Sequence, residues 1–354
     1  MKATRFHGKE DIRTEQIPEP ELLPGSLKIK PEWTGICGTD LHEYEEGAIF
    51  CPKPGHPHPL TGETTPVVLG HEMAGVVAEI GEGVEGFAVG DRVAVEPYIL
   101  CGECEYCLGG EQYNLCPKAG YYGLSGRGGG FAEYVVVRDP AMVHPLGELS
   151  TEIGALVEPL SVAHHAVRQS GAKAGDTAVV FGAGPIGLFI TLVLRAVGVS
   201  AIYNVEISSI RKEKAHSAGS TVVIDPTEED VVARVRGLTG GRGTDVAFEC
   251  VAASPALQAA MDCTKSGGTV VNVSIWSHNA DINLFGLTMR ELRLVGTSAY
   301  ANDHAAVIKL LQEGKLGDVE QYITGRIAVE DVVERGFKQL VHNKEENVKI
   351  IVHP

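Results

Sequence analysis

Two different hydrophobic patterns divide the chain. From about residue 176 to residue 296, short apolar runs rich in β-branched residues alternate with helical stretches; these runs are TAVVFG, AIYNVE, STVVID, TDVAFE, GTVVNVS and LRLVGT. Alternation of strands with helices is typical of a parallel, doubly wound sheet. The region is therefore predicted to be an α/β domain.

The residues on either side of this region follow other patterns. Residues 1 to about 155 contain strand-like runs, such as LKIKPEW, GVVAEIG, DRVAVEP and FAEYVVV, separated by Gly and Pro. Such punctuation favours a compact, mostly β domain with functional loops. Helical spacing at 303–313 and 329–340 precedes a last strand, VKIIV. We predict a β-rich domain (1–155), an α/β domain (156–297) and a C-terminal segment (298–354) that returns to the first domain.

Composition and charge narrow the class of partner. The 354 residues, 44% of them hydrophobic, suffice for roughly two folded domains. Lys and Arg number 30 against 46 Asp and Glu, a net charge of −16, and no basic block occurs. That field repels nucleic acid and anionic membranes. We expect the partner to be a small molecule or another copy of the chain.

The hydrophobic pattern predicts neither an export signal nor a membrane span. The N-terminal MKATRFHGKEDIRTEQ scatters charges where a signal peptide needs an apolar run, so we expect a cytosolic protein. The uncharged stretch 177–194 is long enough to resemble a span. Gly182, Gly184, Pro185 and Gly187 divide it into a short strand and a helix start.

A glycine-rich turn in this stretch predicts a dinucleotide site. In Gly182-Ala183-Gly184-Pro185-Ile186-Gly187, the first glycine permits a tight turn, the second lets the backbone approach a pyrophosphate and the third allows close packing of helix on strand. Glu206 ends the next strand, 24 positions after Gly182, where a carboxylate can accept hydrogen bonds from ribose hydroxyls. The carboxylate would repel a 2′-phosphate, so NAD is favoured over NADP.

Other residues are weaker candidates for the same site. Arg211, about one turn later, either lies near the adenosine or is a solvated helix arginine. Val273, Ser274 and Ser298, which end or follow the last two strand-like runs, are further candidates for cofactor contacts. The alternative for the glycines is a tight turn without a ligand.

Four of the eight cysteines predict a structural metal. In a reducing compartment the cysteines should be thiols. Four thiolates on one loop complete a tetrahedral zinc shell and leave no open position for chemistry. The alternatives are an iron–sulfur cluster or unliganded thiols. The four residues are Cys101, Cys104, Cys107 and Cys116.

A second set of metal ligands comes from three separate segments. Cys37 lies in GICGTDLH, His71 in GHE and Glu158 in EPLS. One sulfur, one nitrogen and one oxygen ligand leave the fourth zinc position for water or substrate, as in a catalytic site. Each residue alone has an ordinary explanation: a buried cysteine, a histidine at a strand start and an acid at a helix N-terminus.

The whole chain resembles the zinc-dependent medium-chain dehydrogenases. GICGTDLH, GHE, the four-cysteine lobe, EPLS and GAGPIG occur in that family's order. The resemblance implies a GroES-like β-rich domain, a Rossmann domain and an active-site cleft between them, with catalytic zinc on Cys37, His71 and Glu158. It makes Glu72 an alternate or indirect zinc ligand, where the ordinary explanation is a surface-facing acid in a strand. Since family members are dimers or tetramers, we expect a homodimer or homotetramer.

The resemblance also implies a path for a proton. Thr39 and His42 match the family's relay, in which a hydroxyl passes the proton of an alcohol through the nicotinamide ribose to a histidine near solvent. Asp40 resembles the carboxylate that orients the imidazole of His71. The local alternatives are a turn-stabilising hydroxyl for Thr39, a helix-surface histidine for His42 and a helix cap for Asp40.

Within the family, an acid at position 158 marks the polyol and secondary-alcohol branch. The loop EYEEGAIFCPKPGHPHPLTGETTPVVLGHE and the motifs GLSGRGGGFAEYVVV and GTSAY look most like the (R,R)-2,3-butanediol dehydrogenases. Sorbitol dehydrogenases carry an Arg-Tyr pair where this chain has Ala299 and Tyr300, and a tyrosine where it has Glu43. A pocket without these donors suits a short diol with methyl ends.

The resemblance therefore implies reversible, NAD-linked oxidation of (2R,3R)-2,3-butanediol to (R)-acetoin, with reduction of acetoin or diacetyl in reverse. Two enzymes with the same apparatus, a sorbitol-type polyol dehydrogenase and an L-threonine 3-dehydrogenase, are alternatives. A non-catalytic NAD-binding redox sensor is an alternative of another class.

Two local features lead to further expectations. Eight residues separate Cys107 from Cys116, where the family has seven, which predicts a bulged loop at the structural zinc. His164 and His165 are neighbours on a predicted helix, so we expect that they do not face the same site.

Overall fold

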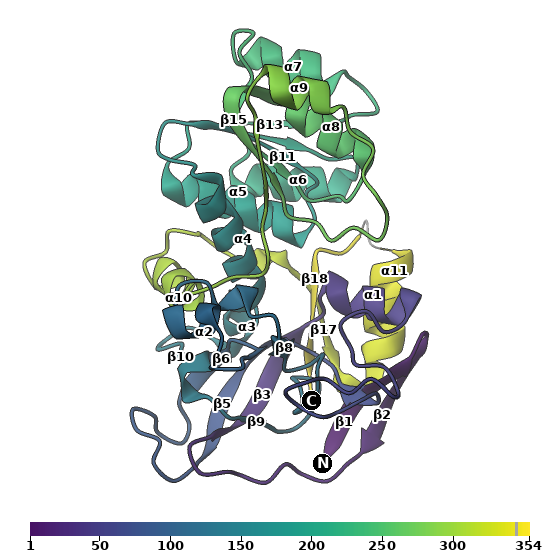
Figure 1. Ribbon diagram of the computed structural model, residues 1–354, viewed down its shortest axis with the longest axis vertical. Coiled ribbons are helices and arrows are strands. Elements are labelled where there is room, and N and C mark those ends of the chain that lie inside the picture. The colour runs from purple at the N-terminus through teal and green to yellow at the C-terminus, as the bar shows by residue number, and fades with distance from the viewer. Residues whose placement is uncertain (344–345) are drawn as a thin grey trace. The chain divides into compact units, whose positions relative to one another are not determined.

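The computed structural model describes residues 1–343 and 346–354, which form two compact units (Figure 1). Unit 1 comprises residues 1–158, 304–313 and 318–354, and unit 2 comprises residues 159–303 and 314–317. The predicted segments end at residues 155 and 297, whereas the chain passes between the units after residues 158 and 303.

Unit 2 contains a six-stranded parallel sheet. Its strands are β11 (Thr177–Phe181), β12 (Ala201–Val205), β13 (Val222–Ile224), β14 (Thr244–Glu249), β15 (Thr264–Asn272) and β16 (Arg293–Gly296). They lie in the order β13-β12-β11-β14-β15-β16, with every neighbour parallel. Each strand overlaps one of the six predicted apolar runs, so the predicted doubly wound sheet is confirmed.

Helices cover this sheet and connect its strands (Figure 1). They are α5 (Pro185–Val197), α6 (Ser209–Ala218), α7 (Val231–Leu238), α8 (Ser254–Cys263) and α9 (Leu284–Met289). The strand order reverses between β11 and β14, and in such sheets ligands bind outside the carboxyl ends of the strands at this point. Stretch 177–194 forms β11 and most of α5, and no helix of the described residues has both the length and the apolar character needed to span a membrane.

Unit 1 is mostly β-structure. Its strands are β1 (Lys2–Gly8), β2 (Asp11–Gln16), β3 (Leu27–Gly35), β4 (Val67–Val68), β5 (Glu72–Ile80), β6 (Arg92–Val95), β7 (Tyr98–Ile99), β8 (Gly120–Tyr121), β9 (Val135–Val137), β10 (Val143–Pro145), β17 (Ile323–Ala328) and β18 (Lys349–His353). The largest sheet has the order β10-β6-β5-β3-β18-β17, with β9 paired to β3. The C-terminal strand therefore lies inside the sheet of the N-terminal part.

Short helices fill the connections of unit 1. They are α1 (Gly38–Glu46), α2 (Glu105–Gly109), α3 (Thr151–Gly154), α10 (His304–Gln312), α11 (Lys338–His342) and the 3₁₀ turns η1 (Tyr113–Leu115), η2 (Pro140–Met142) and η3 (Glu320–Tyr322). Helix α4 (Val157–Ser170) begins in unit 1 and continues in unit 2. The helical spacing at 329–340 corresponds to a 3₁₀ turn, η4 (Val329–Asp331), a π-helical turn, η5 (Val332–Phe337), and the start of α11.

Candidate functional site

Strand pairing brings two of the predicted metal ligands together. Strands β3 and β5 are antiparallel, and Gly35 at the end of β3 lies opposite Glu72 at the start of β5. Cys37 follows β3 and His71 precedes β5, so the two residues leave the sheet at the same place. The imidazole of His71 lies near enough to Cys37 for the charge of the thiolate to act on the ring.

Asp40 holds both residues from the first turn of α1. Its Oδ2 accepts a hydrogen bond of 2.9 Å from the backbone N–H of Cys37, and its Oδ1 lies 3.5 Å from Nδ1 of His71. Burial opposes protonation of His71, but the charges of Asp40 and then Cys37 outweigh it and raise the pKa of the imidazole well above its usual value. Asp40 thus caps the helix and faces the imidazole at once, which leaves Nε2 of His71 for a metal.

Glu158 and Glu72 complete the acidic surroundings of this pair. Both side chains are buried, at 7% and 1% exposure, so Glu72 is not the surface-facing acid of the ordinary explanation. A Cβ at position 35 would lie 1.9 Å from Oε2 of Glu72, so the buried carboxylate requires Gly35. Among the described residues, ligand atoms within 4.8 Å of one another occur in the four-cysteine lobe and not in this set.

Lys349 is a member of this site that sequence reasoning missed. Its Nζ lies 2.7 Å from each carboxylate oxygen of Glu72 and donates to the carbonyl of Ile36 at 3.0 Å. Burial lowers the pKa of Lys349, but the charges of Glu72 and Cys37, with a smaller effect of Glu158, outweigh it and raise the pKa. The signal in the sequence was a lysine inside the apolar strand VKIIV.

The predicted proton relay lies on one helix. The hydroxyl of Thr39 is 3.7 Å from the sulfur of Cys37, and His42 follows three residues later on the same face of α1. The His42 side chain is 40% exposed, with Nδ1 3.5 Å from Oε1 of Glu46. One residue is therefore beside a predicted metal ligand and the other is open to solvent, while the relay itself stays a prediction.

Glu43 has a structural role at the end of the same helix. Its carboxylate is buried and accepts hydrogen bonds from the backbone N–H groups of Ile49, Phe50 and Cys51 at 3.0, 2.6 and 3.4 Å. A side chain occupied in this way holds the loop that follows α1, and it offers no hydroxyl donor to a ligand.

The four-cysteine lobe fits a zinc ion. Three of the distances between sulfur atoms are 3.5 Å (Cys104 to Cys107), 3.5 Å (Cys116 to Cys101) and 3.8 Å (Cys101 to Cys107). A tetrahedron with Zn–S bonds of about 2.3 Å has edges of about 3.8 Å. The backbone N–H of Glu103, with that of Cys104, lowers the pKa of Cys101 to about 6 against the effect of burial.

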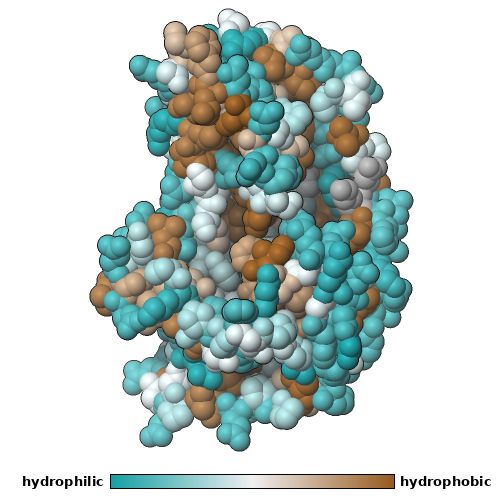
Figure 2. Space-filling model, turned by 45° about the vertical axis from the view of Figure 1, so that its right-hand side comes forward, coloured by the Kyte–Doolittle hydropathy of each residue, from teal (hydrophilic) through white to brown (hydrophobic). Residues whose placement is uncertain are grey.

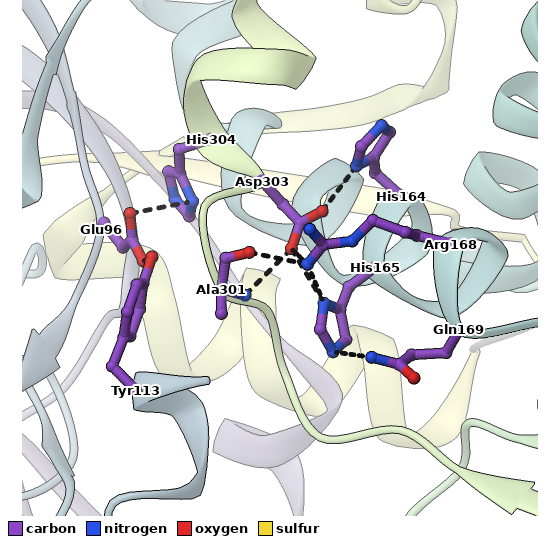
Figure 3. Close-up of polar contacts among 9 residues, drawn as sticks. All are labelled: Glu96, Tyr113, His164, His165, Arg168, Gln169, Ala301, Asp303 and His304. Atoms are coloured by element: carbon purple, nitrogen blue, oxygen red, sulfur yellow. Dashed lines mark hydrogen bonds and ion pairs between the residues drawn. The ribbon is translucent and has the colours of Figure 1, made fainter. Parts of the chain in front are cut away.

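The long spacing before Cys116 is accommodated by local structure. Helix α2 ends at Gly110 in a left-handed conformation (φ 71°), and the turn η1 leads to Cys116. Tyr113 in this turn donates a hydrogen bond of 2.6 Å to the buried carboxylate of Glu96, which also lies 3.7 Å from His304 (Figure 3). The same carboxylate lies 2.9 Å from Nε2 of His144. These contacts hold the lobe within unit 1.

The glycine turn of unit 2 has the geometry that dinucleotide binding needs. Gly182 has φ 90°, in the left-handed region that disfavours side chains. A Cβ on Gly187 would lie 2.0 Å from the carbonyl oxygen of Gly182, so a side chain there is excluded by backbone. Around Gly184 the nearest atom to such a Cβ is Nη1 of Arg211 at 3.9 Å, so open space lies above the turn. Pro185 and Ile186 begin α5 at this point.

Glu206 is buried and bound to the same turn. Its Oε2 accepts a hydrogen bond of 2.8 Å from the N–H of Ala183, and its Oε1 accepts bonds of 2.8 and 2.9 Å from Ile207 and Ser208. The carboxylate therefore positions the turn, and Oε2 keeps acceptor capacity for a ribose hydroxyl. Ser298 is exposed after β16, and Val273 and Ser274 follow β15.

Exposed apolar side chains lie at the same end of the sheet as this turn, and sequence reasoning missed them. They follow the carboxyl ends of β12, β14 and β15 and are Ile207 (56% exposed), Ile210 (40%), Val251 (50%) and Ile275 (49%). Figure 2 shows how apolar side chains gather on parts of the surface. Branched aliphatic groups beside a glycine turn are suited to packing on the flat rings of a dinucleotide.

His164 and His165 converge on one group, contrary to the prediction. Their Nδ1 atoms lie 2.6 and 2.9 Å from the two oxygens of Asp303, and Arg168 donates to the same carboxylate at 3.1 Å (Figure 3). Adjacent helix positions point about 100° apart, but the carboxylate lies between them and presents one oxygen to each ring. Burial opposes ionisation of Asp303, but the two histidines hold its pKa below the usual range.

Comparisons with known proteins cover the whole chain. The model of the alcohol dehydrogenase GroES-like domain matches residues 23–148, and the model of the zinc-binding dehydrogenases matches residues 185–313. The chain is 49% identical to an (R,R)-butanediol dehydrogenase of Neisseria gonorrhoeae, over 100% of this chain and 99% of that protein. It is 33% identical to a sorbitol dehydrogenase of Bacillus subtilis, over 100% and 97% of the two chains.

A solved structure has the same fold. The crystal structure of 2R,3R-butanediol dehydrogenase from Bacillus subtilis superposes with a TM-score of 0.93 at 45% identity, and the match covers 100% of this chain and 99% of the other.

Proposed function

Because this chain belongs to the zinc-dependent medium-chain dehydrogenases, we propose that it catalyses the reversible, NAD-linked oxidation of (2R,3R)-2,3-butanediol to (R)-acetoin. The observation that carries the proposal is the full-length identity of 49% to an (R,R)-butanediol dehydrogenase. The reaction needs a zinc site and an NAD site. Cys37 and His71 belong to the first, and the glycine turn at Gly182 belongs to the second.

Cys37, His71 and Glu158 would hold the catalytic zinc, and Cys101, Cys104, Cys107 and Cys116 the structural one. A zinc ion at the first site supplies a Lewis acid that lowers the pKa of a secondary alcohol, and NAD is the hydride acceptor. Asp40 fixes the orientation of the imidazole. Glu72, paired with Lys349, acts as a positioning residue that balances the charges around the ligands.

The chain's own groups would remove the alcohol proton. Thr39, close to the metal ligands, would accept it at Oγ1 while its own hydroxyl proton moves on toward His42, and the exposed ring of His42 would release a proton to water. In unit 2, the N–H of Gly184 and the first N–H groups of α5 that follow Pro185 would bind the pyrophosphate, with Glu206 on the adenosine ribose. Arg211, Val273, Ser274 and Ser298 would line the same cofactor site.

Positions 43 and 299 support a short diol as the substrate. The carboxylate of Glu43 is occupied by three backbone N–H groups, and Ala299 carries no polar group. A sugar alcohol with many hydroxyls therefore lacks two of the donors that we associate with sorbitol dehydrogenases. The eight cysteines are all free, which suits a reducing compartment, and we place the protein in the cytosol.

We further propose that the chain forms a homodimer through one edge of unit 2. Strand β16 ends the parallel sheet, and among the described strands it pairs with β15 alone. Helix α9, just before it, exposes Leu284, Phe285 and Met289 at 59%, 71% and 66%. An open strand edge beside exposed apolar side chains is complementary to a second copy of itself.

NADH formation by the zinc-loaded protein tests the substrate. We expect turnover of (2R,3R)-butanediol with NAD to exceed that of meso-butanediol, sorbitol and L-threonine at matched concentrations, and that with NADP to be much slower. Preference for sorbitol or threonine would contradict the substrate and keep the reaction class. No turnover by protein with a measured zinc content would favour a non-catalytic NAD-binding protein.

A further inference from the structure

Glu249 is a fully buried carboxylate that the proposed reaction does not use. It is the last residue of β14 and has 0% exposure. Its Oε1 accepts hydrogen bonds of 2.7 and 2.9 Å from the backbone N–H groups of Val251 and Ala252, and its Oε2 is bonded to the hydroxyl of Ser274. A carboxylate this deep is stable only when such donors replace water.

These bonds join two loops that lie far apart in the sequence. Residues 250–252 follow β14, and residues 273–274 follow β15. The backbone carbonyl of Glu249 strengthens the connection, because it accepts from the N–H groups of Val273 and Ser274 at 2.9 and 3.3 Å. One residue therefore fixes the carboxyl ends of two adjacent strands relative to each other.

The first of these loops borders the glycine turn. The N–H of Cys250 donates to the carbonyl of Phe181 at 3.1 Å, and a Cβ on Gly182 would lie 2.9 Å from Cγ2 of Val251. Strands β11 and β14 meet where the strand order reverses, which is where ligands bind in such a sheet. The loop held by Glu249 therefore forms one wall of the predicted dinucleotide site.

The loop needs this support for two reasons. Ala252 has φ 61°, a conformation that costs energy in a residue with a Cβ and persists only when its surroundings impose it. Val251 and Ile275 are about half exposed, at 50% and 49%, so packing on the core does not hold them in place. The hydrogen bonds of Glu249 hold the backbone of Val251 and the residue before Ile275, and Asn272 adds bonds to Ser274 and Trp276 in the second loop.

We propose that Glu249 is a positioning residue for NAD, which holds Val251 and Ile275 in place so that they pack against the bound dinucleotide. The inference rests on the proposed function, since it requires that unit 2 binds NAD. The buried carboxylate fixes the two loops, and the apolar side chains of Val251 and Ile275 contact the dinucleotide.

Asp245 provides a matched control in the same strand. Its carboxylate accepts from the backbone N–H and the hydroxyl of Thr177, both at 2.8 Å, and pairs with Lys265. It thus accepts backbone and hydroxyl hydrogen bonds as Glu249 does, and it differs in its additional ion pair with Lys265. It lies near the amino end of β14, whereas the glycine turn follows the carboxyl end of the neighbouring parallel strand β11.

The test is a titration of each protein with NADH, followed by nucleotide fluorescence without substrate, together with melting temperatures without nucleotide. We expect the dissociation constant to rise about threefold in Glu249→Gln, which keeps a neutral acceptor, and at least about tenfold in Glu249→Ala. Asp245→Asn and Asp245→Ala should lose thermal stability but bind NADH within about twofold of wild type, because they do not contact the rim.

The outcomes separate the two proposals. If the wild-type protein does not bind NADH, the proposed function fails. If the wild-type protein binds NADH and the folded Glu249 variants bind it equally well, or the Asp245 variants weaken binding to the same extent, the positioning role is overturned. Should Glu249→Ala fail to fold, the comparison of Glu249→Gln with Asp245→Asn decides.

Discussion

At the scale of single residues, the ion pair of Lys349 and Glu72 leads to a clear stability prediction. The two side chains are 3% and 1% exposed, so water solvates neither charge and each is stabilised by the other. Removing one partner of such a pair leaves a buried, uncompensated charge. We expect Lys349→Met to lower the free energy of unfolding by about 3 kcal/mol or more, as measured by urea denaturation.

Lys28 is the matched control for this substitution. Its side chain is almost equally buried, at 7%, but its partners Glu19 and Glu79 are 49% and 52% exposed. Because these carboxylates stay in water, Lys28→Met should lower the free energy of unfolding by about 1 kcal/mol or less. Similar losses in the two variants would contradict the role of partner burial, and Lys349→Met combined with Glu72→Leu should recover part of the loss.

The contacts that could not be predicted from the sequence join residues that lie far apart along the chain. Cys37, His71 and Asp40 lie in short motifs, so their chemistry could be predicted from local spacing. Lys349 meets Glu72 across 277 positions, and a lysine in a strand gives no information about such a partner. The two histidines on α4 were predicted to diverge because their shared acceptor, Asp303, lies 138 positions or more away.

At the scale of the elements, substitutions in the glycine turn between β11 and α5 should affect protein stability and NADH binding differently. Gly184 has φ −67° and ψ −178°, which alanine adopts freely, and the space around it is open. We expect Gly184→Ala to fold with unchanged or slightly higher stability, by up to about 1 kcal/mol, since it reduces the freedom of the unfolded chain. Its methyl group should nevertheless keep the pyrophosphate from the backbone and weaken NADH binding at least about tenfold.

Gly187 is the contrasting position in the same turn. An alanine there would meet the carbonyl oxygen of Gly182, so Gly187→Ala should lower the melting temperature as well as the affinity. Fluorescence titration and thermal melting of both variants test the distinction. Wild-type affinity of Gly184→Ala for NADH would show that the turn does not bind the pyrophosphate.

Of the two predicted metal sites, we expect one to affect mainly stability and the other mainly activity. We expect about two zinc ions per chain in the wild type and about one in both Cys104→Ser and Cys37→Ser, as measured by elemental analysis. The first variant should also melt at a lower temperature, because its site closes a loop, whereas the second should lose activity with little change in melting. Cys263→Ser, at a buried thiol in α8, should keep both ions.

Most elements could be predicted because their signal is local. The six apolar runs of the α/β region became six strands, since each is short, rich in β-branched residues and bounded by turns. The segment 329–340 was predicted only as helical, and it forms 3₁₀, π and α turns in succession. Gly336 packs so closely on Ile36 that a Cβ would lie 2.6 Å from it, a contact that hydrophobic spacing does not reveal.

At the scale of the whole molecule, the order of the motifs was sufficient to identify the family. The two family models and the full-length relatives confirm that prediction, and the predicted combination of a GroES-like domain with a Rossmann sheet is confirmed with it. Assembly is a different matter, because a strand run such as LRLVGT has the same pattern whether it ends a sheet or lies inside one.

The open edge at β16 leads to a prediction about assembly. Phe285 on α9 is 71% exposed, so Phe285→Asp should leave the fold of the chain intact while it places a charge in the proposed contact between two copies. We expect sedimentation or light scattering to show a smaller assembly than that of the wild type. Val89→Asp changes a side chain of similar exposure, 68%, in a loop of unit 1, and should leave the assembly unchanged. A Phe285→Asp protein with the mass of the wild-type assembly would place the interface elsewhere, because a carboxylate cannot be buried there without a partner.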